Sequence, residues 1–240
     1  MINIFEDIEA LSARAAELFA SVARESVQEK DSFFVALAGG MTPRRMYEKL
    51  AQPEIRDQIP WEKVHIFWSD ERLVPHDDAQ SNYRMTKEAL LDHVPVRHVF
   101  SIPFSDSADA SAHFYEAELH TVFKTLPRFD LCFLGMGADG HTASLFPRSS
   151  VLHETERWVC PARSLSGGPE RVTLTYPVIN NTAKICFLVT GEDKAMTLKQ
   201  VIENADHTVH YPAQDVRPTN GDLIWLLDRA AAKYLTTNEK

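Results

Sequence analysis

The residue best suited to moving a proton is His141, which ends the run GMGADGH (residues 135–141). An imidazole titrates near neutral pH, so His141 can accept a proton from water. Asp139 precedes it by two residues and can orient the ring, as the carboxylate of a catalytic triad does. The glycines predict an irregular loop that presents both side chains above a sheet. We interpret His141 as a general base; the alternative is a structural histidine bonded to a loop carbonyl.

The same loop matches the GxGxxG pattern of dinucleotide-binding proteins. That pattern should open a long helix, but Pro147 lies only seven residues after Gly140. Asp139 would also place a carboxylate against the pyrophosphate. The sequence therefore favours a catalytic loop over a dinucleotide site and predicts no cofactor.

A second candidate site is the run GGMTP. Gly39 and Gly40 permit close approach of a ligand to the backbone and a positive φ. Thr42 is predicted to cap a helix that starts at Pro43, whose free N–H groups would face an anion. We expect a phosphate here, bound by backbone donors and the Thr42 hydroxyl. The alternative is a plain strand-to-helix turn.

Three basic residues follow or open other apolar segments: Arg72, Arg171 and Lys194. Lys194 falls in the first turn of a predicted helix, where a cation opposes the helix dipole unless an anion is near. We expect all three to bind an anionic ligand. For Arg72, the alternative is a solvated ion-pair cluster with Asp70 and Glu71, which would contribute little to stability.

Other catalytic patterns are absent from the sequence. Ser144 lacks the flanking glycines of a hydrolase nucleophile. The three cysteines lie within apolar runs without CxxC spacing and are interpreted as core residues. His207 and His210 have neither HExxH spacing nor a nearby carboxylate. No metal site and no covalent intermediate are predicted.

The candidate residues must be positioned by the strands and helices of the fold. Along the sequence, short apolar runs alternate with segments that show helical periodicity. Buried strands separated by helices predict an α/β fold with a mainly parallel, doubly wound sheet and helices on both faces. Ligands of such sheets bind outside the carboxyl ends of the strands, where the candidate motifs fall. The predicted strands are 33–38, 64–69, 129–135, 157–162 and 185–191, with a late apolar run at 223–227; the predicted helices include residues 8–22, a segment after Ser81, 115–126 and 195–202.

Composition limits the class of partner. The 240 residues carry a net charge of −9, which argues against nucleic-acid and anionic-membrane partners but not against a small anion. No apolar run approaches the roughly 18 residues of a spanning helix, and no signal peptide is evident. We expect one cytoplasmic domain over residues 1–240.

Four stretches together resemble the 6-phosphogluconolactonase family: ALAGGMTPRRMYEKL, FWSDERLVPHDDAQSNYRM, FDLCFLGMGADGHTASLFP and RVTLTYPVINNTAKICFLVTGEDKA. The resemblance implies a sheet related to that of glucosamine-6-phosphate deaminase and ribose-5-phosphate isomerase. It also implies hydrolysis of 6-phospho-D-glucono-1,5-lactone to 6-phosphogluconate in the pentose phosphate pathway, without a cofactor. The partner would be this sugar-phosphate lactone, and the protein a monomer or weak homodimer.

The resemblance also implies residue roles. His141 becomes the base that activates water, and Met41 departs from the small serine or threonine expected at its position, which removes one hydroxyl contact. The implied phosphate turn is Gly39, Gly40 and Thr42, and the implied cations on phosphate or ring hydroxyls are Arg72, Arg171 and Lys194.

Two rivals stay open at this point. Glucosamine-6-phosphate deaminase shares the phosphate turn and a GxDGH loop, but its pattern has a tyrosine where Arg72 stands and an acid where Phe146 stands. Ring opening and isomerisation need several carboxyl groups that pass protons, whereas lactone hydrolysis needs one base. A non-catalytic sugar-phosphate sensor usually carries a DNA-binding segment, and none is evident.

Overall fold

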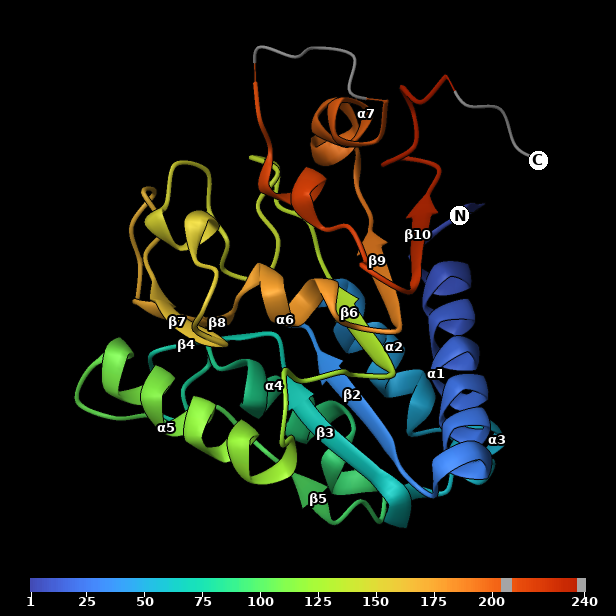
Figure 1. Cartoon of the computed structure of the whole chain (residues 1–240). Coiled ribbons are helices and arrows are strands. Elements are labelled where there is room, and N and C mark those ends of the chain that lie inside the picture. Colours follow the sequence, from blue (N-terminus) through green and yellow to red (C-terminus); the bar gives the residue numbers. More distant parts are fainter. Residues whose placement is uncertain (204–208, 237–240) are drawn as a thin grey trace.

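A seven-stranded sheet forms the centre of the molecule, and every pair of neighbouring strands in it is parallel. The structure is a computed structural model that describes residues 1–203 and 209–236 (Figure 1). The predicted α/β fold is confirmed. In spatial order the strands are β1 (Ile2–Phe5), β10 (Asp222–Asp228), β9 (Lys184–Val189), β6 (Leu131–Leu134), β2 (Phe33–Leu37), β3 (Val64–Trp68) and β5 (His98–Val99).

Helices cover both faces of this sheet. Side chains alternate between the two faces along each strand, so each face presents side chains that a helix or its flanking segment can pack against. Phe33 packs against Phe19 of α1 with ring centroids 5.2 Å apart. Its neighbour Phe34 points the other way and packs against Phe123, just after α5, also at 5.2 Å. The helices are α1 (Ile8–Lys30), α2 (Met41–Leu50), α3 (Pro53–Arg56), α4 (Asn82–Ala89), α5 (Ala108–Val122), α6 (Tyr176–Asn180) and α7 (Ala195–Glu203).

The predicted helix boundaries are partly confirmed. Ser81 caps α4 as expected, since its hydroxyl accepts a hydrogen bond from Arg84 N at 3.1 Å. The helix expected over 115–126 ends at Val122, so Leu126 lies outside it. Within residues 1–203 and 209–236, none of the helices combines the length and the apolar character that crossing a bilayer requires.

The start of α2 corrects one prediction. Thr42 is not the helix cap; it is the second residue of the helix, and Gly40 caps it. Gly40 has a φ of 107°, which favours glycine, and its carbonyl accepts the first helical hydrogen bond from Arg44 N at 3.1 Å. The Thr42 hydroxyl is therefore free to bond elsewhere.

A small antiparallel sheet stands at the carboxyl end of β3, on the side of the molecule away from α1 (Figure 1). The strand expected over 157–162 exists, but it belongs here rather than to the parallel sheet. Ser69 joins the two sheets: its N–H donates to Leu37 O of β2 and its carbonyl accepts from Leu174 N of β8, both at 2.8 Å. The order of the small sheet is β4 (Asp70–Arg72), β8 (Arg171–Leu174) and β7 (Val159–Ala162).

Candidate functional site

A cleft of about 340 Å³ opens where β2, β3 and β6 end and the small sheet begins. Such an edge of a parallel sheet is where ligands bind in α/β proteins. Five of the eight predicted site residues line the cleft: Gly39, Gly40, Arg72, His141 and Arg171. The other three, Asp139, Thr42 and Lys194, lie outside its lining.

Asp139 nevertheless contacts the cleft through His141. The Nδ1 atom of His141 lies 2.5 Å from Asp139 Oδ1, and the His141 side chain is one-third exposed. This hydrogen bond lowers the pKa of Asp139, so the carboxyl is ionised near neutral pH. A carboxylate accepts, so Nδ1 carries the proton and Nε2 holds the lone pair of a neutral ring. Nε2 is therefore the nitrogen that can accept a proton.

Gly137 allows the His141 ring to lie where it does. A Cβ atom on residue 137 would lie 2.2 Å from both Cε1 and Nδ1 of the ring. The backbone fixes the same approach, because Gly137 N donates to His141 O at 2.9 Å. Any side chain at residue 137 must displace the imidazole.

We therefore expect Gly137→Ala to reduce kcat by about 10-fold or more, because a displaced base loses its alignment with water. Steady-state kinetics on the substrate proposed below measure the effect. Gly135→Ala is the matched control, since a Cβ at residue 135 meets nothing within 4 Å. Equal kcat values for the two variants would contradict this account of Gly137.

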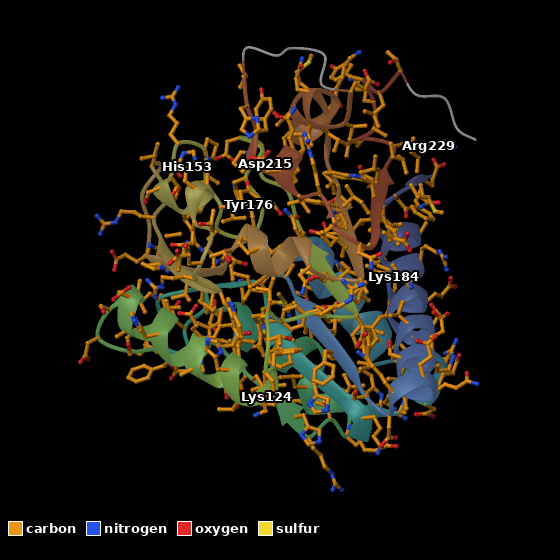
Figure 2. All side chains as sticks on the ribbon, in the orientation of Figure 1. Lys124, His153, Tyr176, Lys184, Asp215 and Arg229 are labelled. Carbon is orange, nitrogen blue, oxygen red and sulfur yellow. The ribbon has the colours of Figure 1, made fainter. Side chains whose placement is uncertain are left out.

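Neighbouring elements hold the rest of the loop that carries His141, residues 135–141. Gly140 has a φ of 76°, and the Tyr211 ring packs so closely on it that a Cβ would come within 2.5 Å. Tyr176, which Figure 2 labels near the middle of the molecule, anchors the segment that carries Tyr211. The hydrogen bonds are Thr197 Oγ1 to Ala138 O (2.7 Å), Thr142 Oγ1 to Gly135 O (2.8 Å), Ala213 N to Gly140 O (3.0 Å) and Tyr176 OH to Pro212 O (2.7 Å).

Arg72 and Arg171 lie directly opposite each other on β4 and β8. Nε of Arg171 is buried and has no hydrogen-bond partner in the part of the chain that the structure describes. Burial, and then the like charge of Arg72, lower the pKa of Arg171. Two facing guanidinium groups repel unless an anion lies between or beside them. This pair is therefore a built positive site at the cleft.

The alternative of a solvated ion-pair cluster around Arg72 is wrong. Asp70 and Glu71 are both buried, and neither forms a salt bridge with Arg72 among the described residues. The Arg72 guanidinium donates instead to Gln80 O at 2.5 Å. Its positive charge is left without a carboxylate partner.

Glu71 positions the residues around Arg72. Its carboxylate accepts four hydrogen bonds, from the N–H groups of Arg72, Asn82 and Tyr83 and from the Ser81 hydroxyl, at 2.7 to 3.0 Å. Burial raises the pKa of Glu71, and these four donors oppose the rise. The carboxylate thus ties β4 to the first turn of α4.

We expect Glu71→Gln to lower the free energy of unfolding by about 2–4 kcal/mol, because an amide NH₂ would face donors and leave buried groups unpaired. Urea unfolding followed by circular dichroism measures this. Glu88→Gln, an exposed residue of α4 paired with Arg84, is the control and should cost less than about 1 kcal/mol. A change at Glu71 as small as that at Glu88 would contradict the assignment.

Several polar residues of the cleft lining were not predicted as site residues: Asp70, Asn82 and Ser144, and also Ser69, Ser164 and Ser166. Asp70 accepts a hydrogen bond from Ser144 Oγ at 2.6 Å, and its backbone carbonyl accepts from Asn82 Nδ2 at 2.9 Å. Gly39 must be glycine because a Cβ there would lie 1.9 Å from Asn82 Oδ1. No local pattern signals these contacts, since they join segments up to 74 residues apart.

Thr42 and Lys194 meet at Thr190, beside the N-terminus of α2. The Thr42 and Thr190 hydroxyls are 2.8 Å apart, and Lys194 Nζ donates to Thr190 O at 3.1 Å. Thr42 and Lys194 are thus joined through Thr190, and Thr42 lies two residues after Gly40, which lines the cleft. They place a further hydroxyl and a further cation beside this end of the candidate site.

No cluster of three or more His, Cys, Asp or Glu side chains suited to a metal ion occurs within residues 1–203 and 209–236. The expectation that His210 has no nearby carboxylate is wrong, because its Nε2 atom lies 2.6 Å from Asp215 Oδ2. His207 lies outside the described residues. The absence of a resident metal or cofactor stays a prediction from the sequence.

A parallel sheet with a carboxyl-end cleft, a histidine–aspartate pair on one wall and paired arginines on another defines the class: an α/β protein with a candidate binding site at the carboxyl edge of its sheet. The chain belongs to the family described as glucosamine-6-phosphate isomerases/6-phosphogluconolactonase, which it matches over residues 6–225. The predicted resemblance is confirmed.

Relatives agree with this placement. The chain is 37% identical to the 6-phosphogluconolactonase of Nostoc sp. over 98% of each chain. It resembles the solved 6-phosphogluconolactonase of Leishmania guyanensis with a TM-score of 0.88 and 30% identity, covering 99% of each chain. A solved monomeric glucosamine-6-phosphate deaminase matches with a TM-score of 0.79 and 22% identity, over 97% of this chain and 98% of the deaminase, which shows a common fold alone.

Proposed function

We propose that this protein hydrolyses 6-phospho-D-glucono-1,5-lactone to 6-phospho-D-gluconate, the second step of the pentose phosphate pathway, without a cofactor. One observation carries the proposal: Nε2 of His141, which can accept a proton, and the facing guanidinium groups of Arg72 and Arg171 line the same cleft. The substrate carries a reactive ester at one end and a phosphate dianion at the other. Relatives named 6-phosphogluconolactonase support the choice of substrate.

The reaction needs one base. Nε2 of His141 takes a proton from water as the water oxygen attacks C1 of the lactone, and the carbonyl oxygen becomes an oxyanion. Asp139 holds the ring in the correct tautomer and stabilises the imidazolium that forms. When the C1–O5 bond breaks, the imidazolium returns its proton to the departing ring oxygen. Water is consumed, and the enzyme regains its starting form.

The oxyanion needs donors, and two loop amides are already occupied. Gly137 N donates to His141 O, and Gly140 N donates to Gly137 O, at 2.9 and 3.0 Å. The positive charge of the arginine pair is then the source of stabilisation that the cleft lining offers. The far phosphate would lie toward the Gly39–Thr42 turn, Thr190 and Lys194, where its binding orients C1 toward His141.

The deaminase rival fits the cleft less well. Ring opening needs a further carboxyl near the histidine, but Phe146 occupies that side, with its ring centroid 4.9 Å from that of His141. Phe146 is 6% exposed and cannot pass a proton. Hydrolysis by a single base is the simpler match.

Pure protein mixed with freshly made lactone tests the proposal. We expect acid release well above the spontaneous rate, followed in a pH-stat. Glucosamine 6-phosphate assayed in parallel for ammonia is the test of the rival. Ammonia release without lactone hydrolysis would replace this function by deamination, and inertness toward both would favour a binding protein.

A further inference from the structure

The ammonium of Lys194 has three acceptors in the structure. Its nitrogen lies 3.1 Å from Thr190 O and 3.1 and 3.2 Å from the two carboxylate oxygens of Asp193. A lysine has three N–H donors, so these acceptors can engage all of them. A phosphate oxygen that binds Lys194 therefore competes with them for its donors and its charge.

The geometry decides which acceptor gives way. Thr190 O belongs to the backbone at the end of β9, next to the hydroxyl that bonds Thr42. The Asp193 carboxylate instead folds back over Gly191, 2.6 Å from where a Cβ would stand, and its side chain is 66% exposed. Rotating an exposed carboxylate into water costs little, whereas moving a strand-end carbonyl displaces backbone.

We propose that Asp193 is an internal competitor for the phosphate of the substrate. It pairs with Lys194 in the absence of substrate, is displaced when the phosphate dianion arrives, and so weakens substrate affinity. This inference rests on the proposed function, because it takes Lys194 as a phosphate ligand. Asp193 acts on binding through Lys194 and takes no part in the chemical step.

Asp193→Asn tests this with little change of shape. We expect the dissociation constant for 6-phosphogluconate to fall about threefold, within the range of an exposed ion pair, and KM for the lactone to fall with it. The value of kcat should stay unchanged, since His141 is untouched. Calorimetry with 6-phosphogluconate and with gluconate, which lacks the phosphate, separates phosphate binding from binding of the sugar acid.

Glu192→Gln is the matched control. It removes the same charge one residue away, but Glu192 pairs with Lys233 at 2.5 Å and not with Lys194. A general loss of negative charge would strengthen binding in both variants; a specific competition strengthens it only in Asp193→Asn. In a Lys194→Met background the effect of Asp193→Asn should vanish, which a double-mutant cycle measures.

The outcomes separate the two proposals. Tighter 6-phosphogluconate binding in Asp193→Asn alone, absent for gluconate, supports the competition. If Asp193→Asn leaves 6-phosphogluconate binding unchanged, or if Glu192→Gln strengthens it equally, the competition is overturned. The proposed function is unaffected by either result. A wild-type protein that binds neither 6-phosphogluconate nor the lactone overturns both.

Discussion

Replacing His141 by alanine should lower kcat for lactone hydrolysis by at least about 10², with little change in KM. In the proposed mechanism the imidazole takes the proton of the attacking water, so its loss would leave that proton to bulk solvent. The proposed phosphate and hydroxyl contacts of the substrate lie elsewhere, so KM should stay near its wild-type value. Initial rates corrected for spontaneous hydrolysis, measured across a range of pH, give both constants.

A second histidine separates the loss of this base from the loss of any imidazole. His153→Ala is the control: this exposed histidine on the 3-10 helix Ser150–His153 lies outside the cleft lining, and Figure 2 labels it on the outer side of the molecule. A fully active His141→Ala protein would end the assignment of the base.

Arg171→Met should have two opposite effects. Removing a partly buried guanidinium that faces Arg72 relieves desolvation and repulsion, so the melting temperature of the protein without ligand should rise by about 2–4 °C, or ~1 kcal/mol for a chain of this size. The same change removes one of the two guanidinium groups at the cleft, so KM should rise about 10-fold or more. Differential scanning fluorimetry and kinetics on one preparation test both.

Arg163→Met is the control for both measurements. Arg163 is exposed, with a side chain 75% accessible, and pairs with Glu170 just before β8. Its loss should change neither the melting temperature nor KM appreciably. An Arg171→Met protein that is less stable and binds substrate normally would show that Arg171 is a structural residue.

The central strands of the parallel sheet could be predicted because most of their residues are buried, whereas the edge strands β1 and β5 are only partly buried and were missed. β2, β3, β6 and β9 all fall within the apolar runs expected of them, give or take two residues. The small sheet could not be predicted in the same way. β4 is three residues long and polar, and its pairing with β8 joins segments about a hundred residues apart. Such a strand is held by long-range contacts: its ladder with β8, the Glu71 carboxylate and the backbone bonds of Ser69.

The residues of the candidate site that follow the end of a strand could be predicted from the sequence. His141, Gly39, Gly40 and Arg72 follow such ends, and the structure brings them to one cleft with Arg171. Their catalytic and binding roles stay predictions. The prediction that Thr42 caps α2 is wrong because Gly40, which has a positive φ, is the N-cap residue. The missed residues, Asp70, Asn82, Ser144 and Thr190, act through long-range contacts that no local pattern records.

Ser69 has a consequence for how far apart the two halves of the cleft stand. The parallel sheet carries the proton acceptor, the small sheet carries the guanidinium groups, and this fully buried residue bonds to both by its backbone. Its hydroxyl also donates to Leu37 O at 3.0 Å, so two of its three hydrogen bonds reach the same carbonyl of β2. The position of the small sheet relative to the parallel sheet, and with it the position of the guanidinium groups relative to His141, depends on the backbone contacts of this one cleft-lining residue.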